Sequence, residues 1–285
     1  MGHLSCSERV QLNDLKSMKT PERTETHVPI PHSVAVGEVL DQLDALGYEY
    51  DNLEIGVSHE QQRAYWLMDL TSDHIAKDWK SCLGGWNSHD KIFPYSLFAG
   101  LNVNICSNTL ATGEVKVKTK HTSKVLDRLP RMVTRALYKI NQHNIINKER
   151  VTKYKDFELP KEDYEFVEIP EDRKAQFPFK QEEQKVFKST AFIHDFVVRS
   201  MDSGVISPSS IKIVLDEWRQ PRYEEFAPRN AWSLSNAYTE AFKKYSNPMQ
   251  LFERGAKITS AIDQLVGYEA PELEEMPEDE EIIVN

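Results

Sequence analysis

The sequence predicts an α+β fold, with antiparallel β-hairpins packed with helices in the N-terminal half and a helical C-terminal half. In the first half, apolar and polar residues alternate at 53–57, 64–70 and 114–119, which is typical of strands with one buried face. Beyond residue 181, apolar residues recur every three or four positions, as they do on the buried side of a helix. A chain of 285 residues with 40% hydrophobic content can build one large domain or two small ones.

The chain begins with a polar stretch. Residues 1–30 contain several prolines and have no sustained periodicity, so we expect an irregular N-terminal arm. An α+β core is expected over 31–150. Its first helix is predicted to begin after Ser33, a suitable N-cap, and to end at Gly47.

Five segments of this core have the apolar content of strands, namely 53–57, 64–70, 92–98, 101–107 and 114–119. The first two are expected to form a β-hairpin. Gly100 is expected to break the third segment from the fourth, and the link 107–113 to close a second antiparallel pair. Ser123 can then cap a helix in which Pro130 lies far enough inside to cause a kink.

The second half of the chain is expected to be helical. A long connection without periodicity is predicted at 151–180, followed by a helical region over 181–268. Its helices are predicted to begin at about residue 181, at Ser207-Pro208, at Asn230 and at Asn247-Pro248. Residues 269–285 hold eight acids and no basic residue, so we expect them to form a disordered acidic tail.

Composition excludes several classes of protein. The chain has 35 Lys and Arg against 45 Asp and Glu, a net charge of −10. No stretch approaches the roughly 20 apolar residues of a membrane helix, and the first thirty residues lack a signal-peptide core. We therefore expect no membrane association and a cytoplasmic location. Cys6, Cys82 and Cys106 are odd in number and far apart, which indicates reduced thiols.

The charges are unevenly distributed along the chain. Residues 115–155 hold twelve Lys and Arg against two acids, a local charge of 12 − 2 = +10. Eight of these cations are candidates for contacting a nucleic acid, namely Lys116, Lys118, Lys120, Lys124, Arg128, Arg131, Arg135 and Lys139. The acidic tail could compete with a polyanion for them. The alternative is a solvated helix face beside a tail that only aids solubility.

A second group of polar residues lies near the presumed central strands, at 86–91, Cys106, Asn108, Thr109 and 120–122. In principle, His89 and His121 could act as a base and its orienting group. A divalent metal is another possibility, held by His89, Asp90, Cys106 and His121. The spacing is specific for neither, and hydrogen bonds to turn backbone are the interpretation we favour.

Other catalytic signatures are missing from the sequence. There is no glycine-rich phosphate loop and no nucleophile elbow. We therefore assign no catalytic residue, no metal and no cofactor, and we expect a binding protein rather than an enzyme.

Eight of the polar residues form motifs that are shared with a known family: Asn87, Ser88, His89, Asp90, Lys91, Asn108, His121 and Thr122. With the segments around 30–33, 46–49, 99–114 and 231–240, they make the chain resemble the phage- and plasmid-associated proteins grouped as domain of unknown function 932. The resemblance covers roughly residues 30 to 265. The chain departs from it at Ser107, which is more often acidic in relatives, and around Ile105, where relatives are more aromatic.

The resemblance implies a phage or mobile-element setting, and hence the cytoplasm of a host cell, without implying a particular activity. Our first hypothesis is a protein that binds single-stranded DNA, and could anneal it, in recombination or replication. It would act as a homo-oligomer, and it requires the eight cations to share one exposed face. Aromatic residues before the basic segment could stack on bases, although core positions suit them better: Tyr65, Trp66, Trp79, Trp86, Phe93, Tyr95 and Phe98.

Two further hypotheses remain open from the sequence. The protein could be a non-enzymatic inhibitor that binds a host anti-phage defence complex, which its overall acidity favours. A weaker hypothesis is a metal-dependent active site around His89, Asp90 and His121.

Overall fold

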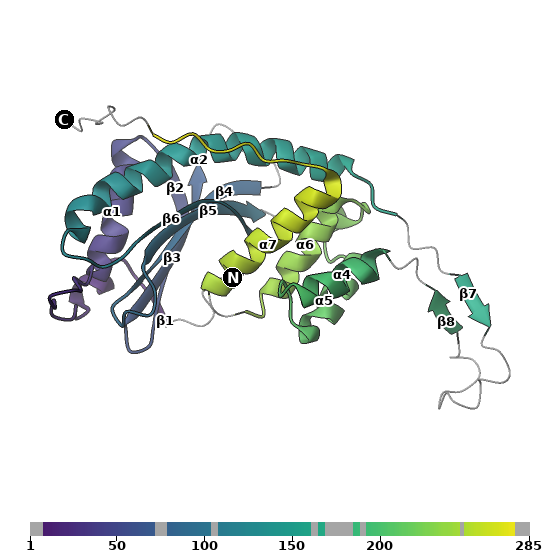
Figure 1. Cartoon of the computed structure of the whole chain (residues 1–285), viewed down its shortest axis with the longest axis horizontal. Helices are drawn as coiled ribbons and strands as arrows, with labels where there is room; N and C mark the ends of the chain where they lie inside the picture. The colour runs from purple at the N-terminus through teal and green to yellow at the C-terminus, as the bar shows by residue number, and fades with distance from the viewer. Residues whose placement is uncertain are drawn as a thin grey trace.

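The computed structural model describes residues 8–71, 79–103, 108–160, 165–168, 185–188, 192–245 and 248–276. Over these residues the chain forms an α+β fold (Figure 1). An antiparallel sheet with helices occupies the N-terminal half, and helices dominate the C-terminal half. The predicted fold class is therefore confirmed.

The main sheet is a six-stranded meander, in which each strand pairs antiparallel with the next strand along the chain. Its strands are β1 (Glu8–Val10), β2 (Glu49–Ser58), β3 (Arg63–Thr71), β4 (Trp79–Ser88), β5 (Tyr95–Val103) and β6 (Asn108–Thr119). A separate pair consists of β7 (Glu165–Glu168) and β8 (Lys185–Lys188). Consecutive antiparallel strands need no crossover connection, so short links suffice in the meander.

Helices flank the sheet and build the second half of the chain. In the described part of the chain, the α-helices are α1 (His32–Ala45), α2 (Val125–Asp156), α4 (Phe192–Asp202), α5 (Pro208–Arg219), α6 (Ala231–Phe242) and α7 (Pro248–Val266). Two short 3-10 helices are η1 (Asp14–Ser17) and η3 (Glu224–Phe226).

Helix α2 joins two hydrophobic cores. One face of the sheet packs against α1 and the first half of α2, burying residues such as Trp66 and Leu137. The second half of α2 packs with α4, α5, α6 and α7 in the second core, which includes Tyr154 and Trp232. On the other face of the sheet, Phe252 of α7 contacts a small aromatic cluster. The 32-residue α2 therefore spans the molecule, as Figure 1 shows.

Strand β4 is an element that the hydrophobic pattern did not predict. It lies inside the sheet and is buried on both faces, so its sequence has no polar alternation. A Cβ at Gly84 would overlap the Phe98 ring, and a Cβ at Gly85 the Trp66 ring, which explains the adjacent glycines. The expected break at Gly100 is wrong, because β5 runs through it with a register shift.

The N-terminal arm is more ordered than expected. Strand β1 pairs with β2 at the edge of the sheet, and η1 follows it. Leu15 and Ile30 are both buried in the first core. The first helix begins at His32, rather than after Ser33, and the helix expected after Ser123 begins at Val125.

Two expectations for the second half need correction. Helix α2 continues to Asp156, into the connection predicted at 151–180. Strand β8 occupies part of the helix predicted from residue 181, so α4 begins only at Phe192. By contrast, α6 begins as predicted, and Asn230 Oδ1 accepts a hydrogen bond of 2.9 Å from the backbone N–H of Ser233.

Candidate nucleic-acid interface

Five cationic side chains at the start of α2, beginning with its N-cap residue Lys124, lie on one side of the helix. Starting from Lys124, they follow at intervals of four, three, four and four residues, at Arg128, Arg131, Arg135 and Lys139. Residues three and four apart are neighbours on a helix surface, so these five form one stripe, about 22 Å long at a rise of about 1.5 Å per residue. The first three are exposed and the last two are half-buried.

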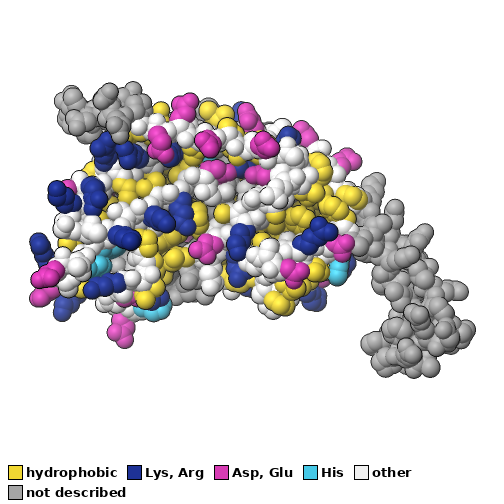
Figure 2. All heavy atoms as spheres, in the orientation of Figure 1, with side chains coloured by type: hydrophobic (Ala, Val, Ile, Leu, Met, Phe, Trp, Pro, Cys, Tyr) yellow, Lys and Arg dark blue, Asp and Glu magenta, His cyan; other side chains and the backbone are white. Residues whose placement is uncertain are grey.

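Strand β6 and the residue that follows it carry three more exposed lysines. Lys116, Lys118 and Lys120 alternate with Val115 and Val117, which face the first core. They therefore point to the other face of the sheet, where Lys116 Nζ lies 4.6 Å from the centroid of the Phe252 ring, and the short link between β6 and α2 joins them to the α2 stripe along the chain. We call these eight residues the cationic surface. In Figure 2, dark blue side chains gather over the half of the molecule that holds β6 and the start of α2.

Little of the cationic surface is neutralised. Of its eight residues, only Lys139 forms an ion pair with a carboxylate in the part of the chain that the structure describes. Arg150, further along α2, shows the opposite behaviour, because it is fully buried and pairs with Glu114 and Asp263. The cationic surface is therefore mostly without carboxylate partners among the described residues, whereas Arg150 is buried and paired.

The partner of Lys139 belongs to an extended segment that runs along α2, residues 268–276, which we call the C-terminal strap (Figure 1). Lys139 Nζ lies 2.6 Å from Glu275 Oε1. The backbone N–H of Glu274 donates to Gln142 Oε1 at 2.7 Å, and Tyr268 donates its hydroxyl proton to the Ile146 carbonyl at 3.1 Å. The strap thus lies across the end of the α2 stripe.

The expectation of a disordered tail is wrong for the first part of the acidic segment. Leu273 packs against the first core, and Met276 is only 7% exposed. These apolar side chains, together with the contacts to α2, offset the entropy cost of ordering the strap. The later acids of the segment, from residue 277, lie outside the described residues.

The family-motif side chains gather around the backbone of Ile30. Asn87 Nδ2 donates to the Ile30 carbonyl at 2.7 Å, and His89 Nε2 donates to the same oxygen at 2.8 Å. The Ile30 N–H donates to His121 Nδ1 at 3.4 Å. His32 joins the group, because its Nδ1 accepts from Asn87 at 2.9 Å. The motif therefore fastens the chain before α1 to the ends of β4 and β6.

The same histidines form two stacked pairs. The rings of His32 and His89 have centroids 3.8 Å apart, and those of His27 and His121 are 5.1 Å apart. Burial and the neighbouring histidines lower the pKa of His32 and of His121 to about 4. These rings are accordingly neutral at pH 7.

The other motif residues have distinct positions. Asp90 Oδ2 lies 2.6 Å from Arg63 Nε, and Ser88 donates its hydroxyl proton to Oδ1. Burial raises the pKa of Asp90, but the hydrogen bonds from Ser88 and Arg63 outweigh it and lower the pKa overall. Asn108 occupies the first position of β6, and its side chain lies outside the described residues.

The metal hypothesis gains no support from the geometry. In the described ranges, no group of three His, Cys, Asp or Glu side chains is placed to hold a metal ion. Cys106, one of the expected ligands, lies outside those ranges. His89 and His121 each use one ring nitrogen in a hydrogen bond to the Ile30 backbone, and Asp90 forms an ion pair with Arg63. The arrangement suits a structural clasp better than acid–base chemistry.

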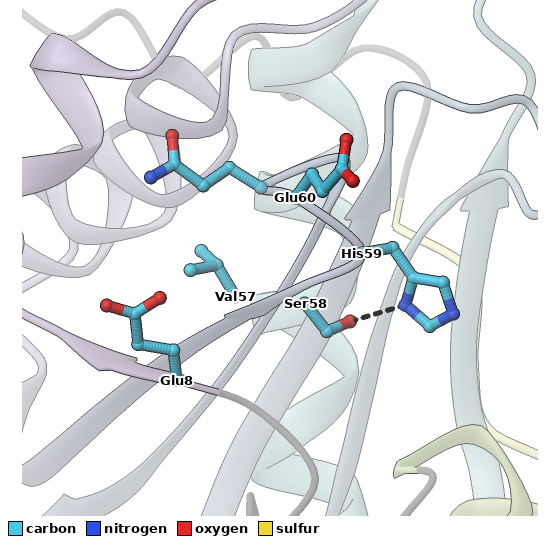
Figure 3. Close-up of a pocket in the computed structure, with 6 residues that line it drawn as sticks. Glu8, Val57, Ser58, His59 and Glu60 are labelled. Carbon is cyan, nitrogen blue, oxygen red and sulfur yellow. Dashed lines mark hydrogen bonds between the residues drawn. The ribbon is translucent and has the colours of Figure 1, made fainter.

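Two pockets flank this cluster. One, of about 370 Å³, is lined by Thr26, His27, Lys91, Ile92, Phe93, Pro94, Lys120, His121 and Thr122, and we call it the Lys91–Lys120 pocket. The other, of about 440 Å³, lies at the β2–β3 turn between Glu8 and Glu60 (Figure 3). In that pocket His59 Nδ1 lies 3.0 Å from Ser58 Oγ, and no lysine or arginine lines it. Only the first pocket suits an anion.

Sequence reasoning missed a buried polar network between β6, α2 and α7. Arg150 Nε lies 3.1 Å from Asp263 Oδ1, and its guanidinium also contacts Glu114. His143 Nε2 and Thr112 Oγ1 are 2.5 Å apart. Burial raises the pKa of Glu114, but hydrogen bonding to His143 and the charge of Arg150 outweigh it and lower the pKa to about 2. The available signal was that polar residues continue the buried stripe of α2 beyond Ile140.

Together these features define an α+β protein whose antiparallel meander is crossed by one long helix with a cationic surface. The chain belongs to the family called domain of unknown function DUF932, whose model matches residues 23–264. The resemblance seen in the motifs is therefore confirmed. Comparison with curated proteins and with solved structures gave no match. Among the described residues, no helix has the length and apolar character needed to cross a membrane.

Proposed function

We propose that this protein binds single-stranded DNA along the cationic surface and anneals complementary strands, in recombination or replication of a phage or other mobile element. One observation carries the proposal: seven of the eight cations have no carboxylate partner among the described residues, and five of the eight form a single stripe on α2. A row of exposed cations attracts a phosphate backbone and gains free energy from the release of its counterions.

Base stacking has a minor role in this proposal, because the aromatic residues considered for it are buried. Each is at most 7% exposed: Tyr65, Trp66, Trp79, Trp86, Phe93, Tyr95 and Phe98. The main contacts are therefore with phosphates. We expect an affinity that depends weakly on base sequence and strongly on salt.

Fluorescence anisotropy with a labelled oligonucleotide tests the proposal. The triple variant Lys124→Gln, Arg128→Gln and Arg131→Gln removes three exposed cations of the stripe. We expect it to bind at least about tenfold more weakly, and its log–log salt slope to fall by about 2, since each phosphate contact on a single strand contributes about 0.7.

The matched control removes three exposed lysines that lie outside the cationic surface, by Lys16→Gln, Lys148→Gln and Lys212→Gln. This control should bind almost as tightly as the unaltered protein. Absence of binding at about 50 mM salt, or an equal loss in both triple variants, would overturn the proposal.

We also propose that the protein acts as a homo-oligomer, because several copies of an α2 stripe about 22 Å long would follow a longer strand. Light scattering during chromatography measures this directly. A protein mass of 32.9 kDa, both alone and after the mass of bound oligonucleotide is subtracted, contradicts it.

The net charge of −10 favours a second function, the inhibition of a host anti-phage defence complex by protein binding. An acidic protein can occupy the DNA-binding face of a nuclease. This alternative predicts a stable complex with a defence protein that survives the Lys124, Arg128 and Arg131 substitutions. It also predicts no affinity for oligonucleotides.

A further inference from the structure

The Lys91–Lys120 pocket lies beside the cationic surface and is not used in the function proposed above. We propose that this pocket binds a phosphate group, and that it holds one phosphate of the DNA strand when the strand lies on α2. The second part rests on the proposed function, whereas the first part does not.

The charges around the pocket suit an anion. Lys91 and Lys120 both line it, and none of the described residues in its lining is an aspartate or glutamate. Neither lysine forms an ion pair with a carboxylate in the described part of the chain. A phosphate group between the two ammonium groups would therefore not displace an existing partner.

His121 adds a hydrogen-bond donor that has no acceptor at ordinary length among the described residues. Its Nδ1 accepts from the Ile30 N–H, so the neutral ring must carry its proton on Nε2. Among the described residues, that buried Nε2 has no hydrogen-bond partner at ordinary length, although the Val28 backbone is near enough to oppose the lowering of the His121 pKa. Nε2 of the stacked His27 is also buried without a partner among these residues. A buried N–H without an acceptor is costly, and a phosphate oxygen in the pocket is an acceptor that a small movement of the ring could reach.

The pocket connects directly to the α2 stripe. Thr122 lines the pocket, and its Oγ1 accepts a hydrogen bond of 2.7 Å from Arg128. Lys120 belongs both to the pocket and to the cationic surface. A strand that follows the stripe toward the start of α2 therefore arrives at the pocket.

An apolar wall completes the site. Ile92 lines the pocket and is 66% exposed, which is unusual for a large aliphatic residue. Phe93 and Pro94 follow it in the same lining. A pocket of about 370 Å³ is within the range of about 300–1,000 Å³ that small ligands occupy, so a nucleotide unit can place its phosphate between the lysines and its sugar against Ile92.

Histidine NMR on the whole protein tests phosphate binding without DNA. We would titrate inorganic phosphate at constant ionic strength, with sodium chloride as the reference salt, and follow the imidazole signals of His27 and His121. We expect saturable shifts of both signals, while His194 on α4, far along the chain from the pocket, stays unchanged.

A double variant, Lys91→Asn with Lys120→Gln, should abolish these shifts. Asparagine is chosen at position 91 because the backbone there has φ +64°, a conformation that asparagine tolerates. Lys148→Gln with Lys212→Gln, which removes two exposed lysines away from the pocket, is the matched control and should keep the shifts. With a labelled oligonucleotide, the double variant should bind about tenfold more weakly than this control, in line with the loss of two phosphate contacts.

The outcomes separate the two proposals. If phosphate does not shift the His27 and His121 signals of the unaltered protein, the proposed phosphate site is overturned, even if oligonucleotides bind through α2. Saturable shifts that vanish in the double variant support the pocket, even if no oligonucleotide binds and the proposed function fails. A folded double variant, with unchanged amide spectra, that still shows the shifts also overturns the pocket.

Discussion

The buried histidines make the fold sensitive to acid. In the folded protein the pKa of His32 and of His121 is about 4, against about 6.5 for a free histidine, so the unfolded chain binds more protons between these values. The contribution of these two histidines to the free energy of unfolding is therefore fully present above about pH 6.5 and is lost as the pH drops toward 4. We expect a loss on the order of 2 kcal/mol per histidine by about pH 4.5, measured by urea unfolding across this range.

A substitution at one of these histidines identifies the source of the acid sensitivity. In His121→Asn, the amide oxygen can still accept from the Ile30 N–H but the side chain does not titrate. We expect a shallower decline of stability between pH 6.5 and 4 than in the unaltered protein. A decline of the same steepness would mean that other groups cause it.

Glu114 is a second residue with a specific prediction. Glu114→Gln keeps the shape of the side chain but leaves buried Arg150 with a single carboxylate partner, Asp263. Breaking a buried ion pair on one side costs about 3 kcal/mol, so we expect a loss of that size in the free energy of unfolding. Asp216→Asn removes the partner of exposed Lys212 and should cost less than about 1 kcal/mol. Equal costs for the two changes would contradict the assigned role of the network.

At the scale of elements, the C-terminal strap covers the end of the α2 stripe, and we propose that it competes with DNA for that position. Glu275→Gln removes the ion pair with Lys139. We expect oligonucleotide affinity to rise about threefold at low salt and the difference to shrink as salt is added. Anisotropy titrations at two salt concentrations measure this change.

The strap contains its own control residue. Glu272 is exposed and carries the same charge, so Glu272→Gln changes the net charge equally without touching Lys139. If both variants raise the affinity by the same amount, long-range charge explains the effect and local competition does not.

The elements that could be predicted from the sequence have apolar alternation or a clear helix start, even where the structure buries them on every side, as it does β3 and α6. The hairpin of β2 and β3 shows alternation in its inner part, and α6 has a clear N-cap in Asn230. Strand β4 could not be recognised, because Lys80, Ser81 and the pair Gly84-Gly85 interrupt its apolar residues although nearly all of its positions are buried. The acidic composition of the strap predicts disorder, because it does not reveal that two apolar residues, Leu273 and Met276, pack against the rest of the protein.

The candidate site was predictable in part for a similar reason. The α2 cations could be placed on one face because helical spacing is local information. The gathering of Asn87, His89 and His121 on Ile30 depends on contacts between residues 57 to 91 positions apart, which spacing along the chain does not reveal. The sequence therefore predicted the motif residues but not the Ile30 backbone that they bind.

At the scale of the whole molecule, α2 should couple the two cores during unfolding. The helix contributes to the first core with its first half and to the second core with its second half. Neither core can lose its segment of α2 without loss of packing in the other, so we expect one cooperative transition. Urea unfolding followed by tryptophan fluorescence and by far-ultraviolet circular dichroism should give coincident curves. Two separate transitions would show that the halves are independent.

The order of the elements also has a consequence for synthesis on the ribosome. Each strand of the meander pairs with its neighbour in the chain, so the sheet can assemble progressively as the polypeptide emerges. The strap follows in the chain everything that it covers, so it leaves the exit tunnel after α2 and the sheet. Until Glu275 emerges, the nascent chain presents Lys139 without its carboxylate partner.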